Sequence, residues 1–256
     1  MIQSVTIIGA GNIAVHLLKR LKSAGLDQLV AYSRSDDFSG VPENIKPLLT
    51  NDPQIFHKRT DLFIIAVKDD SIAEVAGKVK DHGQIVVHTS GSTSIKALER
   101  FSNYGVIYPL QTFSKDRALS WDQIPVFIEA SDGNTKQEIS TFANKLTSSI
   151  HYKNSEERRK LHISAVFVSN FVNHMFVQGK ELADHQGVDF SLFMPLIHET
   201  VNKSFAMDPL KAQTGPALRN DKVTLKKHLE ALKKDPDKFQ LYELISEAIF
   251  RKGKKP

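Results

Sequence analysis

The chain has 256 residues, of which 41% are hydrophobic and 25% charged, and its formal net charge is +5. This length suits one large domain or two smaller ones with a sizeable core. There is no cysteine, which excludes disulfide bonds, thiolate nucleophiles and cysteine metal ligands and is compatible with a reducing cytoplasm.

Four positive charges lie in the last six residues, and the rest of the chain is nearly neutral, with no basic stripe interleaved with aromatic residues. We therefore expect no nucleic-acid partner. No apolar stretch approaches about 18 residues, and no basic segment precedes the first apolar run. We expect neither a membrane span nor secretion, and we expect a cytoplasmic location.

A glycine-rich turn near the start of the chain carries the clearest motif. Residues 5–8 form a β-branched run, typical of a buried parallel strand. Gly9, Gly11 and Ala14 then give the pattern G-x-G-x-x-A, and residues 12–23 predict an amphipathic helix. The glycines permit a tight turn and a close backbone approach to a pyrophosphate, which the helix N-terminus attracts. The pattern favours a dinucleotide-binding unit over a glycine turn in an ordinary α/β domain.

The second predicted strand, residues 29–32, indicates which dinucleotide binds. NAD sites usually carry an acidic residue about 20 positions past the fingerprint; here Ser33, Arg34 and Ser35 stand there. An arginine fork and hydroxyl donors suit a 2′-phosphate, although a solvated arginine at a strand end is the alternative. We predict NADP(H), contacted by Gly9, Gly11, Asn12, Ile13, Ser33, Arg34, Ser35, Val67, Lys68 and Thr89.

Alternating strands and helices continue to residue 152. Further strands are expected at 61–67, 84–87, 106–108, 126–129 and 149–152, with helices at 72–80, 93–101 and 135–146. This alternation predicts a doubly wound parallel sheet, whose ligands bind beyond the carboxyl ends of the strands. The polar turns after Ile8, Tyr32, Val67, Val87 and Tyr108 are therefore expected to meet in one crevice.

From Asn154 the pattern becomes helical. Helices are expected at 155–186, at 191–205, from a cap at Asn220 or Asp221 to residue 234, and at 238–251. We predict an α/β fold with an N-terminal Rossmann domain, residues 1–153, and an all-α domain, residues 154–256.

The whole chain resembles the superfamily of pyrroline-5-carboxylate reductases, 6-phosphogluconate and 3-hydroxyisobutyrate dehydrogenases and ketopantoate reductases. More specifically, it is similar to uncharacterised bacterial Rossmann-like NADP oxidoreductases with a helical C-terminal domain. The resemblance is carried by residues 9–14, 66–72, 88–92, 108–113 and 214–221. Two positions depart from the patterns: Lys68 stands where that bacterial group more often has proline, and Val166, four residues before Asn170, replaces the lysine of the hydroxyacid dehydrogenases.

Candidate catalytic residues lie at the end of the strand at 84–87. The resemblance implies a serine near the nicotinamide and substrate, and Ser90 occupies that place, followed by Gly91, which permits close backbone approach. His88 is a candidate general acid, because histidine titrates near neutral pH. The alternatives are a helix-capping turn for Ser90 and a histidine bonded to backbone for His88.

A second set of candidates lies in the predicted helical domain. Asn170 and His174 interrupt an apolar helix with a polar strip, and His162 is expected to border the same crevice. Asn170 is a candidate for orienting a carbonyl or imine, and Arg219 for clamping a carboxylate; the alternatives are an interhelical hydrogen bond and an ion pair with Asp221. The substrate-binding candidates are Ser90, Gly91, Asn170, His174 and Arg219. The remaining histidines show no metal-ligand spacing, so we predict no metal.

These features predict an NADP(H)-dependent oxidoreductase acting on a small carbonyl, hydroxy-acid or imine substrate. The alternative is an NADP(H)-binding sensor without turnover. Residues 161–176 are apolar on more than one face, and a helix apolar nearly all round must be covered on all sides. We expect a second copy of the chain to provide that cover in a homodimer; burial by the Rossmann domain is the alternative.

Overall fold

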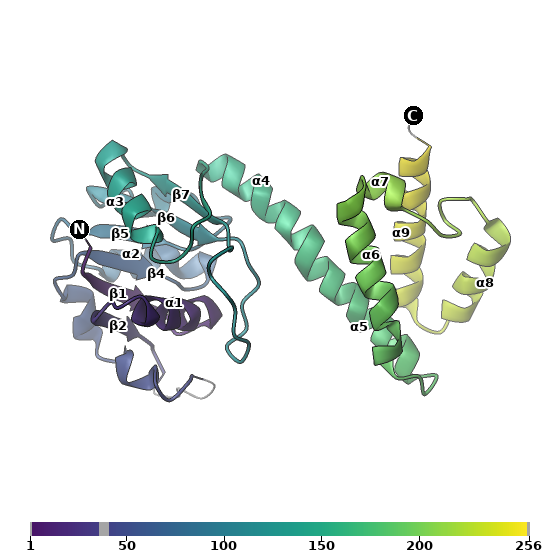
Figure 1. Ribbon diagram of the computed structural model, residues 1–256, viewed down its shortest axis with the longest axis horizontal. Helices are drawn as coiled ribbons and strands as arrows, with labels where there is room; N and C mark the ends of the chain where they lie inside the picture. The colour runs from purple at the N-terminus through teal and green to yellow at the C-terminus, as the bar shows by residue number, and fades with distance from the viewer. Residues whose placement is uncertain (1, 36–40, 255–256) are drawn as a thin grey trace. The chain divides into compact units, whose positions relative to one another are not determined.

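The computed structural model describes residues 2–35 and 41–254, and it separates the chain into two compact units, Met1–Asn170 and Phe171–Pro256. In the described part of the first unit, eight strands form one sheet in the order β3-β2-β1-β4-β5-β6-β7-β8 (Figure 1). The strands are β1 (Ser4–Ile8), β2 (Gln28–Tyr32), β3 (Leu49–Thr50), β4 (Leu62–Ile65), β5 (Ile85–His88), β6 (Asn103–Pro109), β7 (Val126–Ala130) and β8 (Ile150–Tyr152).

Helices cover both faces of this sheet because its strands are apolar on both sides. In β4, Leu62 and Ile64 pack with helices α1 (Asn12–Ser23) and α3 (Gly133–Ala143), whereas the alternate residues Phe63 and Ile65 pack with α2 (Ile72–Lys78). The order of β1, β2 and β4 reverses direction at β1, which places a ligand crevice at the carboxyl ends of these strands. The predicted α/β class and the bounds of the first helix, 12–23, are confirmed.

The sheet differs from the predicted parallel one at a single junction between described strands: β7 runs antiparallel to β6. Residues 110–125 contain no helix, and a parallel return needs a crossover of that kind. The helix predicted at 93–101 is also wrong, because only the short 3₁₀ turn η4 (Ile95–Leu98) forms there. Three more 3₁₀ turns complete this region: η1 (Lys46–Leu48), η2 (Pro53–His57) and η3 (Asp69–Ser71).

The helical part begins at α4 (Ser155–Ala165), where Asn154 and Glu157 form a capping box. The helix predicted at 155–186 is confirmed over residues 155–184, and it contains a π-helical stretch, η5 (Val166–Phe171), between α4 and α5 (Val172–Asp184). The second unit then holds η6 (Phe190–Phe193), α6 (Met194–Ala206), α7 (Pro209–Ala212), α8 (Lys222–Leu232) and α9 (Pro236–Gly253). Among the described residues, no helix has the length and apolar character needed to cross a membrane.

Candidate active site

A cavity of about 1120 Å³ opens at the carboxyl ends of β1, β2 and β4. It is lined by the glycine-rich turn, by the residues that follow β2 and β4, and by Phe113 and Lys115 from the segment after β6. The predicted cofactor residues that line it are Gly9, Gly11, Asn12, Ile13, Ser33, Arg34, Ser35, Val67 and Lys68; Thr89 does not. The turn after β5 is likewise absent from this lining. The crevice was predicted to include this turn, so fewer strand ends form it than expected.

The backbone at Gly9 explains why the cavity is open at the start of α1. Gly9 has φ +127°, and a Cβ at this position would lie 2.3 Å from the Ala66 carbonyl oxygen, so only glycine fits. Gly11 is the N-cap of α1, and a Cβ there would meet no described atom within 4 Å. No acidic residue occupies the first turn of α1. Asn12 and Ile13 of this first turn line the cavity, so the N–H groups at the helix start are available to a pyrophosphate group.

Basic side chains surround the end of the cavity near β2. The exposed Arg34 follows β2, and Lys78 of α2 lines the same cavity. Glu74 accepts a hydrogen bond of 2.7 Å from Lys78. This bond and the charge of Lys78 hold the pKa of Glu74 below its usual value, and the charge of Arg34 acts in the same direction. This cluster of charges fits a 2′-phosphate, so the residues present match NADP(H).

The segment after β6 lies against the start of α1. The Asn12 side-chain amide donates to the Phe113 carbonyl at 2.8 Å, and His16 Nε2 is 2.9 Å from the Ser114 carbonyl. The Phe113 ring packs 5.5 Å from the ring of Trp121, measured between centroids. Trp121 is buried and is thus one aromatic ring removed from the cavity.

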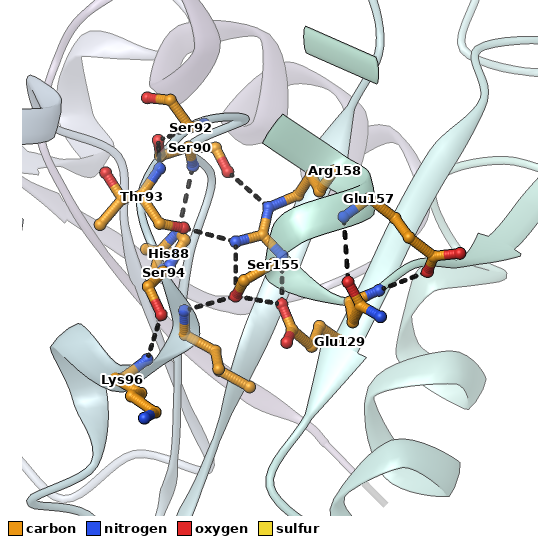
Figure 2. A network of polar contacts seen from close by, with 12 residues as sticks. His88, Ser90, Ser92, Thr93, Ser94, Lys96, Glu129, Ser155, Glu157 and Arg158 are labelled. Carbon is orange, nitrogen blue, oxygen red and sulfur yellow. Dashed lines mark hydrogen bonds and ion pairs between the residues drawn. The ribbon is translucent and has the colours of Figure 1, made fainter. Parts of the chain in front are cut away.

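A network of buried polar groups occupies the ends of β5 and β7 (Figure 2). Its centre is Arg158 of α4, whose side chain is 1% exposed. The guanidinium pairs with Glu129 of β7 and donates to the carbonyls of Ser90, at 3.2 Å, and Thr93. Ser155 donates to Glu129 at 2.8 Å. Arg158 therefore fixes the loop after β5 by satisfying its carbonyl groups with a charged fork.

Ser90 belongs to this loop, and His88 is the last residue of β5 before it. The Ser90 N–H donates to His88 Nδ1 at 3.1 Å, and Ser90 Oγ accepts from the N–H groups of Ser92, at 3.1 Å, and Thr93, at 2.9 Å. Burial, and then the charge of Arg158, lower the pKa of His88 to about 4. The imidazole is neutral at pH 7, and its Nδ1 already serves as an acceptor.

A second aromatic pair borders the same loop. The Tyr108 hydroxyl at the end of β6 lies 2.9 Å from His162 Nδ1 of α4. A Cβ on Gly91 would lie 2.7 Å from His162 Nδ1 and 2.8 Å from Tyr108 Cζ. The loop backbone next to Ser90 is thus in direct contact with both rings, which only glycine permits.

The remaining candidates lie further along the chain, beyond α4. Asn170 is exposed in the π-helical stretch, a type of distortion that often accompanies functional residues. His174 is exposed on α5, with Nε2 3.2 Å from the Gln178 side chain. Arg219 is exposed, and its charge helps to lower the pKa of Asp221, after the hydrogen bonds from Thr224. The segment 214–217 lines an apolar cavity of about 330 Å³ within the helical unit.

Arg158, Glu129 and Tyr108 were missed as candidates because their main contacts join distant parts of the chain. One signal was available for Arg158. A positive charge in the first turn of a helix is unfavourable next to the helix dipole, so an arginine there indicates a partner outside the helix. Among the described residues, no group of histidine and carboxylate side chains could hold a metal ion.

The fold and the cavity define a Rossmann-type dinucleotide-binding protein. Two family models match the chain: NADP oxidoreductase coenzyme F420-dependent over residues 4–91, and a domain of unknown function, DUF2520, over residues 124–249. A crystal structure from Bacteroides fragilis, described as a "putative NADP oxidoreductase", is 35% identical, covers 97% of this chain and 98% of its own, and superposes with a TM-score of 0.89. The chain belongs to this NADP oxidoreductase family, and its cofactor is NADP(H).

More distant structures share the fold. A pyrroline-5-carboxylate reductase from Coxiella burnetii is 17% identical, with coverage of 99% of this chain and 98% of that one and a TM-score of 0.57. A reductive aminase from Aspergillus terreus, in complex with NADPH, is 14% identical, with coverage of 97% and 94% and a TM-score of 0.70. A comparison with curated proteins gives no match.

Proposed function

We propose that this protein transfers a hydride between NADP(H) and a small carbonyl, hydroxy-acid or imine compound. The observation that carries the proposal is the link between the cofactor cavity and the loop after β5. Ser92 of that loop donates to the carboxylate of Asp69, and Asp69 follows Lys68, which lines the cavity. When bound, NADP(H) supplies the hydride chemistry.

The chain's own residues would bind and orient the substrate beside this link. We assign Ser90 a catalytic role as a hydroxyl near the reacting carbon, and Gly91 the close backbone approach. His88, neutral and buried, would hold the Ser90 backbone through its Nδ1. Asn170 is proposed to orient the substrate's polar group, with His174 and Arg219 as further substrate-binding residues.

The test is NADPH oxidation, followed by absorbance, against a panel of 2-keto acids and cyclic imines. We expect Ser90→Ala and Asn170→Ala each to lower kcat more than tenfold while NADPH affinity stays nearly unchanged. Ser164→Ala is the matched control, because the exposed Ser164 hydroxyl donates to a carbonyl of its own helix, that of Lys160, at 3.2 Å. If the two variants lose stability and keep turnover, both residues have a structural role. If the protein binds NADPH but reduces none of the probes, the result favours the alternative function, an NADP(H)-binding sensor.

We infer that the functional protein is a homodimer built by the helical unit. Large apolar side chains are exposed on this unit, among them Phe205 at 90%, Leu192 at 72% and Leu196 at 63%. Single exposed apolar residues are normal, but a concentration of them marks an interaction surface, and a second copy covers such a surface in a two-fold interface. Sedimentation at micromolar concentration should give twice 28.7 kDa. Leu196→Glu should shift it to the single mass; a wild-type monomer contradicts the dimer.

A further inference from the structure

The reaction proposed above needs a proton as well as a hydride, and His88 is poorly placed to give one. It is fully buried, and its Nδ1 accepts from the Ser90 N–H. Among the described residues, its buried Nε2 has no hydrogen-bond partner within 3.5 Å. The lowered pKa of His88 keeps it neutral at physiological pH. A proton donor must be sought among the groups that touch the same loop.

His162 is such a group. Its ring lies against Gly91, where a Cβ would be 2.7 Å from Nδ1, and Gly91 directly follows Ser90. Arg158, one helical turn before His162 on α4, donates to the Ser90 carbonyl at 3.2 Å. Arg158 and His162 therefore contact the same loop from one face of α4. His162 is half-buried, whereas Tyr108 is 8% exposed. The imidazole of His162 is therefore more accessible than the phenol ring of Tyr108.

Resting on the proposed function, we propose that His162 is the catalytic acid, giving a proton from Nε2 to the substrate's oxygen or nitrogen, and that Tyr108 is its positioning residue. Tyr108 accepts a hydrogen bond from Nδ1–H across the 2.9 Å contact. Its ring is fixed in turn by Phe127 of β7, 6.4 Å away between centroids. Burial raises the pKa of Tyr108, so the phenol remains neutral and can serve as an acceptor.

The step balances in the reductive direction. The substrate carbon gains a hydride, with its two electrons, from the reduced cofactor. The substrate heteroatom gains the proton of Nε2 as the π bond between carbon and heteroatom breaks. His162 is left neutral with its remaining proton on Nδ1, directed at Tyr108, and Nε2 takes a new proton from solvent. In the oxidative direction the same atom acts as a base.

The charges around His162 come from its own helix and from two other elements. Arg158 on α4 is paired with Glu129 of β7, and Asp69 of η3 acts on Tyr108 and on His88. The guanidinium charge is thus neutralised locally, and the Tyr108 hydroxyl is the polar group that contacts the ring directly. Removing this hydroxyl should leave the Nδ1 proton of His162 without the acceptor assigned to it here.

The test compares His162→Gln, Tyr108→Phe and the control His185→Gln with the wild type, using 2-methyl-1-pyrroline and pyruvate as probes. His185 is an exposed histidine at the C-cap of α5. We expect His162→Gln to lower kcat about 100-fold or more, with NADPH affinity unchanged, and His185→Gln to have no effect. Tyr108→Phe should lower kcat about tenfold and move the alkaline limb of its pH profile to lower pH.

A second readout does not depend on turnover. In ¹H–¹⁵N spectra of the protein without cofactor, the Nδ1 proton of His162 should be hydrogen-bonded and slow to exchange, and Tyr108→Phe should abolish this protection. Turnover by His162→Gln above half of the wild-type value, or an unprotected Nδ1 in the wild type, overturns the assignment. A wild type that reduces neither probe, with Nδ1 protected as expected, contradicts the proposed function and retains the His162–Tyr108 pair. If His162→Gln has a clearly lower Tm than the wild type, the same measurements are made on His162→Asn.

Discussion

The two polar regions of the first unit differ in how they are filled. At the ends of β1, β2 and β4, glycine backbone and exposed basic side chains surround a cavity of about 1120 Å³. At the ends of β5 and β7, Arg158 fills the space, and Glu129 and the carbonyls of the loop neutralise and satisfy it. A region built to receive a charged ligand leaves charges facing open space, whereas a region built to hold a loop pairs them within the protein.

This difference implies that substitutions of the charges lining the cavity change nucleotide affinity, whereas substitutions that break the Arg158–Glu129 pair change stability. A result in which the two kinds of effect are exchanged would break the comparison.

The largest effect is expected for Arg158→Met, which leaves Glu129 without its partner. Breaking a buried pair in this way costs about 3–5 kcal/mol of unfolding free energy, measurable by urea denaturation. The neighbouring Arg159 is exposed, and Arg159→Met should stay within about 0.5 kcal/mol of the wild type. NADPH affinity should be unchanged in the folded Arg158→Met protein. If Arg158→Met loses no more unfolding free energy than Arg159→Met, the buried pair contributes nothing to stability.

The next effect concerns pH and His88. Its pKa falls from 6.5 to about 4 on folding, so the unfolded chain takes up the proton first as the pH drops. Stability is therefore lost between pH 6.5 and 4, and the shift corresponds to about 3 kcal/mol. His88→Asn cannot titrate, so its unfolding free energy should vary less over this window than that of the wild type. Equal slopes for the two proteins would contradict a buried neutral imidazole.

The smallest effects belong to the open region. NADPH should bind at least about ten times more tightly than NADH, a difference of about 1.4 kcal/mol, and Arg34→Glu should abolish this preference without changing the urea midpoint. Quenching of Trp121, the single tryptophan, reports binding. Glu74→Gln should strengthen NADPH binding about threefold, because Glu74 competes with the 2′-phosphate for the same cations. Equal affinities of the wild type for both cofactors would refute the role of Arg34.

Local patterns were sufficient to predict much of this molecule. The bounds of α1, the turn at Gly9 and the position of Arg34 depend on residues close together in sequence, and the structure places all of them at the cavity. The antiparallel strand β7 could not be predicted, because it depends on how a segment without a helix crosses the sheet. Tyr108 and His162 meet across 54 residues of chain, and no local spacing encodes such a pair.

The contacts of Arg158 also determine when the first unit can be completed during synthesis. The guanidinium reaches back 68 residues to Ser90 and 29 to Glu129. Until residue 158 has emerged, the strands β5 and β7 can pair, but the carbonyls of the loop and the Glu129 carboxylate lack their donor. A fragment ending at residue 153, where the helical pattern begins, would be held in this incomplete state. A nucleotide-binding fragment prepared on its own should therefore extend through α4, so that it includes Arg158.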